Sequence, residues 1–100
     1  LRMNQKHYYV YILANKYNSV LYVGMTSDLR NRMYQHKEKV YPRSFSARYN
    51  INKLMYYEVF EDPWSAICRE KQLKAGSSLK KRALIEQENN AYEDLSMEWF

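Results

Sequence analysis

The 100-residue sequence contains one cysteine, two glycines and two prolines. A lone cysteine, Cys68, cannot form an internal disulfide, and no Cys/His spacing typical of a zinc site occurs, so packing must stabilise the chain. No apolar run approaches the roughly 20 residues that span a bilayer, and the first residues lack the pattern of a signal peptide. These absences predict a soluble protein of the reducing cytoplasm, with no membrane association.

The low content of glycine and proline also bears on order. Hydrophobic residues make up 46% of the chain, which indicates a folded protein rather than a linker or a disordered tail. A chain of this length accommodates one modest core. No repeat or low-complexity stretch interrupts it. We therefore expect one domain over residues 1–100.

Charge is moderately one-sided. Sixteen Lys and Arg residues against eleven Asp and Glu give a formal net charge of +5. Such a field attracts polyanions, although solvated helix faces explain the same residues. The basic residues concentrate in the segments 30–39 and 71–82. The candidate nucleic-acid contacts there are Arg30, Lys37, Lys71, Lys74, Lys80, Lys81 and Arg82.

Three short segments have the composition of strands. Aromatic and β-branched residues dominate 7–13 (HYYVYIL) and 20–24 (VLYVG), which predict a hairpin, and also 53–60 (KLMYYEVF).

Three further segments have helical signals, namely 26–40, 62–76 and 77–89. The second begins with Asp-Pro and ends at a glycine, the asymmetry expected of a helix with both ends marked. Segment 41–50 has no clear period and is expected to be a loop. The order predicts an α+β fold, with a small, three-stranded, mostly antiparallel sheet flanked by about three helices.

The hairpin is expected to bring two tyrosines together. If its loop is centred between Lys16 and Tyr17, Tyr11 faces Tyr22 and both side chains project from the same face. Aromatic cross-strand pairs commonly stabilise sheets, so a structural role explains the pair as well as a functional one.

The first helix carries two basic groups at the edge of its buried side. Helical spacing places Leu29, Met33 and Val40 on one stripe, with Arg32 and His36 at its border. A snorkelling arginine and a hydrogen-bonded boundary histidine are the ordinary explanation. The functional explanation is that Arg32 and His36 belong to one binding or catalytic site.

The helix over 62–76 carries a carboxylate in the corresponding position. Glu70 lies within the apolar arc of Ala66, Ile67 and Leu73, where a charge is costly unless it is paired. Pairing with Lys74 or with a base of the first helix would satisfy it. Ligation of a metal ion is the alternative.

Together these segments resemble the GIY-YIG nuclease family, in particular its small stand-alone members. The resemblance runs through YVY at 9–11, YVG at 22–24, TSDLRNRMYQH at 26–36 and AICREKQLK at 66–74, and ends in KKRALIEQENNAYEDL at 80–95. No single motif is specific, but their order and spacing are.

The resemblance implies a metal-dependent endonuclease that hydrolyses phosphodiester bonds. Glu70 would hold a single Mg²⁺ or Mn²⁺, and Arg32 would bind the scissile phosphate. Tyr11 and Tyr22 would orient or deprotonate the attacking water, with His36 completing the hydrogen-bonded group. A base role requires a neighbouring cation or the metal to lower a tyrosine pKa from about 10. Asn89 would match the asparagine that helps to close the site.

The expected substrate is DNA, with RNA as the second option, contacted mainly through phosphates. Cleavage would then be structure-preferring or nonspecific, in keeping with DNA repair or recombination. We expect a monomer without a small-molecule cofactor. The candidate residues Tyr11, Tyr22, Arg32, His36 and Glu70 should converge on one concave patch.

Three positions depart from the family pattern: Tyr9 replaces a glycine, Met25 stands where some active relatives carry lysine, and Asn90 replaces a proline. Without that lysine, one route to a lowered tyrosine pKa is missing. A catalytically silent nucleic-acid-binding module on the same fold is therefore the alternative. A protein-interaction domain would explain the tyrosines, but neither Glu70 nor the pair of Arg32 and His36.

Overall fold

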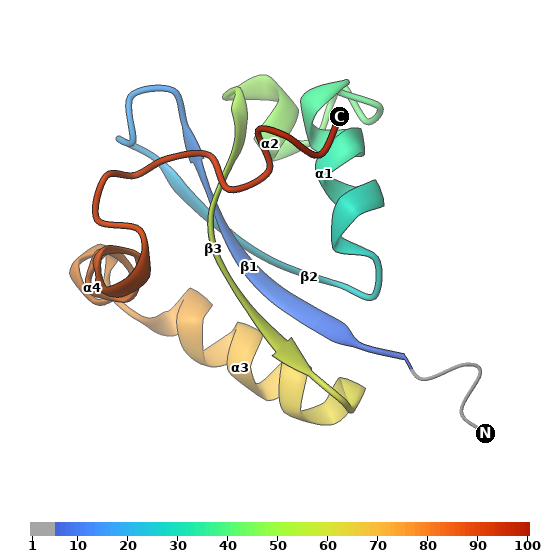
Figure 1. Ribbon diagram of the computed structural model, residues 1–100, viewed down its shortest axis with the longest axis vertical. Coiled ribbons are helices and arrows are strands. Elements are labelled where there is room, and N and C mark those ends of the chain that lie inside the picture. The colour runs from blue at the N-terminus through green and yellow to red at the C-terminus, as the bar shows by residue number, and fades with distance from the viewer. Residues whose placement is uncertain (1–5) are drawn as a thin grey trace.

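The computed structural model describes residues 6–100, which form three strands and four helices (Figure 1). Their order is β1 (Tyr8–Asn15), β2 (Leu21–Thr26), α1 (Leu29–Lys37), α2 (Phe45–Arg48), β3 (Ile51–Phe60), α3 (Pro63–Ala75) and α4 (Ser78–Glu88). The predicted α+β class is confirmed. The additional element is α2, a short helix within the segment that we expected to be a loop.

The sheet has the order β2-β1-β3, and β1 pairs antiparallel with both neighbours. Alternate residues of a strand point to opposite faces. Val10 and Ile12 accordingly join the core cluster that includes Ala66 and Leu73 of α3, whereas Tyr11 joins the cluster that includes Met33 of α1. Helices α1 and α2 lie on one face of the sheet, and α3 and α4 lie on the other (Figure 1).

The predicted hairpin register is wrong by two residues. Tyr11 is paired with Gly24, and Tyr22 is paired with Leu13. The reason lies in the turn between the strands. The side-chain oxygen of Asn15 accepts hydrogen bonds from the backbone N–H groups of residues 19 and 20 at 2.8 and 3.1 Å, which moves the centre of the hairpin loop towards β2. Because the shift is even, both tyrosines still occupy the same face.

Helix α1 is shorter than predicted. It begins after Asp28, whose side chain accepts a hydrogen bond from the backbone N–H of Asn31, and it ends at Lys37. Leu29 and Met33 are buried as expected. Val40, expected on the buried stripe, lies beyond the helix end and is 46% exposed. The chain has left the helix at Lys39, which has a φ of 52°.

The ends of α3 and α4 follow their sequence signals. Asp62 caps α3 by accepting a hydrogen bond from the backbone N–H of Ser65, Pro63 occupies the first turn and Gly76 follows the last helical residue. Ser77 caps α4 in the same way. After α4 the chain returns across the sheet towards α1, where the C-terminus lies (Figure 1). In the described residues 6–100, no helix is long and apolar enough to cross a membrane.

Candidate active site

The centre of the site is Tyr11, on the middle strand. Its side chain is fully buried. Its ring lies against the backbone of Gly24, so close that a Cβ atom on residue 24 would overlap the hydroxyl oxygen and approach Cζ to 2.5 Å. A Cβ does not tolerate contacts under 3.0 Å, so the glycine of the YVG motif provides the space that Tyr11 occupies.

His36 connects Tyr11 to the short helix α2. Its Nε2 atom lies 3.3 Å from the Tyr11 hydroxyl, and its Nδ1 atom lies 2.9 Å from the hydroxyl oxygen of Ser46. Ser46 is buried. A neutral imidazole donates from one nitrogen and accepts at the other, so both contacts can be hydrogen bonds. Three elements, β1, α1 and α2, thus meet at one polar group.

Burial keeps this group uncharged at neutral pH. Desolvation raises the pKa of Tyr11 to about 12, although the charge of Arg32 and a hydrogen bond from it act in the opposite direction. Desolvation, together with the Arg32 charge, lowers the pKa of His36 to about 4. A neighbouring cation, which a base role would require, is therefore present in Arg32, but burial outweighs its effect on the pKa of Tyr11.

A cavity of about 290 Å³ opens beside this group. Arg32, His36 and Tyr22 line it from α1 and β2, and the segment 41–47 closes the other side. None of the lining residues is acidic; they are Tyr22, Arg32, Gln35, His36, Tyr41, Ser44, Phe45, Ser46 and Ala47. The ring of Tyr22 also lies 6.1 Å from that of His36. A cavity with an arginine, hydroxyl groups and no carboxylate is suited to a phosphate group.

Glu70 approaches the site from the other face of the sheet. It belongs to α3, which packs against β1 and the edge strand β2. Its negative charge makes a minor contribution to the raised pKa of Tyr11. Glu70 also forms an ion pair with Lys74 at 3.3 Å, as one of the alternatives anticipated. Tyr11, Tyr22, Arg32 and His36 therefore lie together on the α1 face, whereas Glu70 belongs to a helix of the opposite face, so the expected convergence on one patch is shown for four of the five residues.

The donor atoms near Tyr11 can be compared with those that a divalent cation requires. Within residues 6–100, no cluster of three or more His, Cys, Asp or Glu side chains could hold a metal ion. Mg²⁺, however, is commonly held by one or two carboxylates together with water and substrate phosphate. Glu70 is partly exposed and supplies one carboxylate, which fits a metal that the substrate helps to bind.

Met25 lies on the other side of the sheet from the tyrosines. It packs against the cluster formed by Val10 and α3, while Tyr11 belongs to the α1 cluster. A lysine at this position would start from the α3 face, on which Glu70 lies, and not beside the tyrosines as we had inferred from the sequence. The absence of lysine therefore bears first on the surroundings of Glu70.

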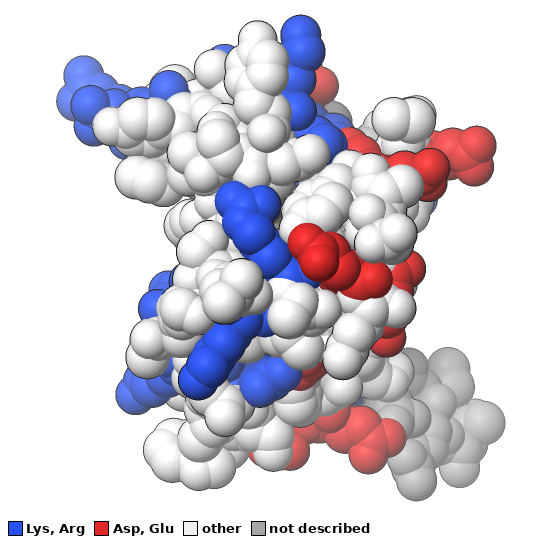
Figure 2. All heavy atoms as spheres, turned by 90° about the vertical axis from the view of Figure 1, so that its left-hand side faces the viewer, with Lys and Arg blue, Asp and Glu red and all other residues white. Residues whose placement is uncertain are grey.

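The candidate basic contacts differ in how free they are. Lys71 and Lys80 are exposed, and Lys81 is partly buried. Arg82 donates a hydrogen bond to the carbonyl oxygen of Asn18 at 2.8 Å, so it also fastens the hairpin loop to α4. Figure 2 shows the side of the molecule that carries α4 and this loop, with basic side chains spread over it and acidic ones mainly along its right-hand edge.

Arg30 and Lys74 each have a partner within the chain. The guanidinium of Arg30 lies 5.5 Å from the ring centre of Phe100, and Lys74 is paired with Glu70. Both remain at the surface. Neither has to leave a buried position in order to contact a phosphate.

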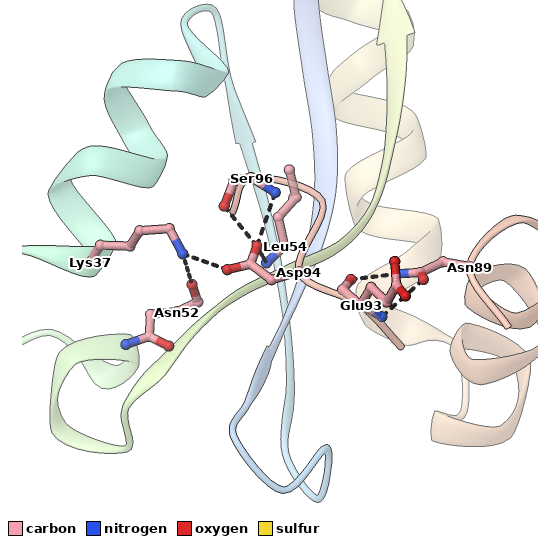
Figure 3. Close-up of polar contacts among 7 residues, drawn as sticks. All are labelled: Lys37, Asn52, Leu54, Asn89, Glu93, Asp94 and Ser96. Atoms are coloured by element: carbon pink, nitrogen blue, oxygen red, sulfur yellow. Dashed lines mark hydrogen bonds and ion pairs between the residues drawn. The ribbon is translucent and has the colours of Figure 1, made fainter. Parts of the chain in front are cut away.

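Lys37 has a structural role that the sequence did not indicate. Its ammonium group lies 2.6 Å from a carboxylate oxygen of Asp94 and donates to the carbonyl oxygen of Asn52 at 3.0 Å (Figure 3). The other Asp94 oxygen accepts from the backbone N–H groups of Leu54 and Ser96. Lys37 thus fastens the C-terminal segment to α1 and β3, and contact with a phosphate would compete with this ion pair.

Asn89 is likewise engaged in the fold. Its amide nitrogen donates to the carbonyl oxygen of Met55 at 3.1 Å. The same nitrogen donates to the carbonyl oxygen of Glu93 at 2.8 Å, and the amide oxygen accepts from the backbone N–H of Glu93 (Figure 3). Asn89 is buried at the end of α4. Met55, its partner on β3, belongs to the core cluster on the α3 side. The structure therefore shows Asn89 shaping the return of the chain and not in contact with the Tyr11–His36 pair.

Sequence reasoning missed the contribution of α2. Ser46 bonds to His36, and Phe45 lines the cavity, yet both belong to the segment that was expected to be a loop. The local signal available was Ser44, a residue type common at helix starts, whose side chain accepts from the backbone N–H of Ala47. No spacing in the sequence associates Ser46 with a histidine ten residues earlier.

Fold and site together define a small α+β domain with a cavity free of acidic residues beside the buried Tyr11 and the partly buried His36. The GIY-YIG catalytic domain family matches residues 7–83, and the chain belongs to this family. The family is typically one of nucleases, which identifies nucleic acid as the class of substrate. No curated protein sequence matches the chain significantly.

Among solved structures, the solution NMR structure of the UPF0213 protein BH0048 from Bacillus halodurans is similar. It is 27% identical in sequence, and the similarity covers 92% of this chain and 97% of that one, with a TM-score of 0.55. This similarity supports the arrangement of the three antiparallel strands and the flanking helices.

Proposed function

We propose that the protein is a divalent-metal-dependent endonuclease that hydrolyses phosphodiester bonds in DNA. The observation that supports this most strongly is the cavity in which Arg32, Tyr22 and His36 meet, next to Tyr11 and within electrostatic reach of Glu70. A family that is typically nuclease supplies the class of chemistry.

Arg32 binds the scissile phosphate in this proposal. Its guanidinium is always charged and offers a planar set of donors that match phosphate oxygens. Because it already lies beside Tyr11 at the cavity, it would also stabilise the charge that develops during hydrolysis. The absence of carboxylates from the cavity lining leaves the arginine free of a competing anion there.

The two tyrosines have different roles. Burial raises the pKa of Tyr11 to about 12, so its hydroxyl is protonated at neutral pH and serves as a hydrogen-bond donor unless the metal lowers that pKa. The Tyr11 hydroxyl contacts His36, and His36 contacts Ser46, so these contacts fix the side chains next to the cavity. Tyr22 lines the cavity and orients the attacking water there.

Glu70 holds a single Mg²⁺ or Mn²⁺ in this proposal. Bound with substrate phosphate and water, the ion supplies Lewis-acid stabilisation of the developing charge. For Glu70 to serve as a ligand, its ion pair with Lys74 has to open. Since Lys74 is exposed, its ammonium group can turn to solvent or to a phosphate.

The exposed basic residues are proposed to contact the sugar-phosphate backbone. Such contacts position a nucleic acid without reading its sequence. Cleavage should therefore be nonspecific or structure-preferring, a property suited to DNA repair or recombination. Observed affinity should fall as salt rises, because bound counterions are released on binding.

Cleavage of single-stranded, branched and duplex DNA with Mg²⁺ or Mn²⁺ tests the proposal. We expect Arg32→Ala and Glu70→Gln to lose about a hundredfold or more in rate, since each removes charge stabilisation at the reacting phosphate. Glu88→Gln, an exposed change on α4, is the control and should cleave at the wild-type rate.

Two outcomes would contradict the proposal. If the wild type cleaves no DNA under any metal condition, the catalytic claim fails and a nucleic-acid-binding module on the same fold takes its place. If cleavage survives Glu70→Gln, the metal belongs to another carboxylate. Binding should change little in Glu70→Gln, because the substitution removes a negative charge.

A further inference from the structure

Three aromatic rings form a continuous row that leads outward from the cavity. The ring of Tyr22 stacks on that of Phe45, with ring centroids 6.3 Å apart and ring planes inclined by 24°. The ring centroids of Phe45 and Tyr49 are 4.8 Å apart. Phe45 is 50% exposed and Tyr49 is 52% exposed. We call this row of Tyr22, Phe45 and Tyr49 the aromatic strip.

The two outer rings of the strip do not serve the core, whereas Tyr22 packs against the cluster on the α1 face. Neither Phe45 nor Tyr49 belongs to the two clusters that fill the faces of the sheet. Single exposed aromatic residues are common and need no explanation, but adjoining rings at the mouth of a cavity indicate a binding surface. Tyr41, at the rim of the same cavity, is 62% exposed.

The strip is continuous with the candidate active site. Tyr22 lines the cavity together with Arg32, and its ring also contacts that of His36. Each base of a nucleic acid is joined through its sugar to the phosphates of the backbone. A base stacked on the strip would therefore bring the phosphates next to it close to the cavity. The strip is thus located where a substrate strand would pass.

The charge around the strip matches a nucleic acid. From Lys39 to Tyr57, both included, the sequence contains four basic residues and no Asp or Glu. Two of the four, Arg43 and Arg48, are exposed in or next to α2. An aromatic surface surrounded by basic groups is the combination that binds single strands, where bases stack on rings and cations contact phosphates.

The strip is held in place before any ligand arrives. The side chain of Ser44 accepts from the backbone N–H of Ala47 at the start of α2, and Ser46 bonds to His36. Beyond the helix, the ammonium of Lys39 donates to the side-chain oxygen of Asn50. A preformed surface loses little entropy on binding, which favours its use for recognition.

We propose that the aromatic strip is a stacking site for unpaired bases and that it directs the protein to single-stranded nucleic acid or to unpaired segments of branched nucleic acid. In a duplex the faces of the bases are covered by their neighbours, so only unpaired bases can stack on Phe45 and Tyr49. The inference rests on the proposed function and deepens it by naming the class of substrate.

Equilibrium binding without metal provides the test. Fluorescence anisotropy of a short end-labelled oligothymidylate is compared with that of a duplex of the same length, in EDTA and at fixed salt. The wild type should bind the single strand more tightly than the duplex. The double variant Phe45→Leu/Tyr49→Leu should lose roughly tenfold or more in affinity for the single strand and less than about twofold for the duplex.

The control is Trp64→Leu, which removes a ring that is 72% exposed at the start of α3, a helix of the opposite face. It should bind both nucleic acids as the wild type does. Thermal melting reports whether each variant is folded, and the single variants Phe45→Leu and Tyr49→Leu replace the double variant if it is not. The salt dependence of binding should be the same in all variants, because no charge changes.

The result that overturns the inference is an equal loss for single strand and duplex, or no loss for either. The strip would then be free for another partner, such as an acidic peptide. The assay needs neither metal nor cleavage, so its outcome is independent of the catalytic claim. A nuclease whose preference is unchanged in the double variant contradicts the inference alone, and a silent protein that shows the expected losses contradicts only the catalytic proposal.

Discussion

The two faces of the sheet share a middle strand but differ in chemistry. On the α3 face, Val10 and Ile12 pack into a cluster with Ala66, Leu73 and Ile85. Tyr11 stands between these two residues in the sequence, but its side chain is buried on the α1 face, where its hydroxyl contacts His36. Because neighbouring residues of a strand point in opposite directions, one strand supplies packing to one side and a polar site to the other.

Polar groups are also satisfied differently on the two sides. On the α3 side, Arg69 and Glu58 pair at 2.9 Å. Burial of Glu58 alone would raise its carboxyl pKa, but hydrogen bonds from Arg69 and Tyr56 outweigh this and lower it. On the α1 side, Tyr11 and His36 are held neutral next to a cavity. Perturbed groups beside a cavity are typical of functional sites, whereas a paired charge serves the fold.

The largest expected effect on stability comes from the α3 face. Ile12→Ala removes a fully buried side chain and should lower the free energy of unfolding by about 2–5 kcal/mol. Denaturant unfolding measures this change, and Ile12→Val should cost only about 0.5–1.5 kcal/mol. DNA binding by the folded protein should be unaffected. A change in binding at low temperature would show that the two faces are not separate.

Gly24→Ala should affect the α1 face. The added Cβ overlaps the Tyr11 ring, which is buried and cannot move freely, so we expect a loss of about 1–3 kcal/mol in stability together with reduced cleavage. The double variant Gly24→Ala/Tyr11→Leu should be less destabilised than the sum of the two single changes, because leucine lacks the ring atoms that the added Cβ would overlap. Strict additivity in a double-mutant cycle would contradict the packing that we describe.

Asp94→Asn tests the fastening between the C-terminal segment and α1. Burial alone would raise the pKa of Asp94, but hydrogen bonds from Lys37, Ser96 and the Leu54 backbone lower it. The free energy of unfolding of this variant should be lower by about 1–2 kcal/mol, because an uncharged amide cannot form the ion pair with the ammonium group of Lys37. The loss should shrink in acid, where the wild-type carboxylate also becomes protonated. A loss independent of pH would exclude the ion pair as its cause.

The smallest effect concerns His36 and pH. An unfolded histidine binds a proton near pH 6.5 but the folded one only near 4, so between these values the unfolded state binds more protons and stability falls as pH falls. His36 is only partly buried, so water reduces the effect. The difference in Tm between wild type and His36→Asn should therefore decrease from about pH 7 to about pH 4.5. A difference that grows in acid would contradict a neutral His36.

Local signals in the sequence determined most of the secondary structure. Asp-Pro at 62–63 and Gly76 mark the ends of α3, because caps and the restricted proline ring act within a few residues. Alternation in β1 and β2 placed Tyr11 and Tyr22 on one face, and this prediction held although the register was off by two, because a shift by an even number of residues leaves each side chain on the same face. Helical spacing likewise identified Arg32 and His36 as neighbours at the border of a buried stripe.

Only the tertiary structure decided which distant groups meet. Lys37 pairs with Asp94, 57 positions away, and Ser46 holds His36 from a segment without periodicity. The position of Glu70 relative to Tyr11 also depends on how α3 packs against β1 and the edge strand β2. Propensities and caps act over one or two turns of chain, whereas these contacts depend on the packing of whole elements, which no local pattern encodes.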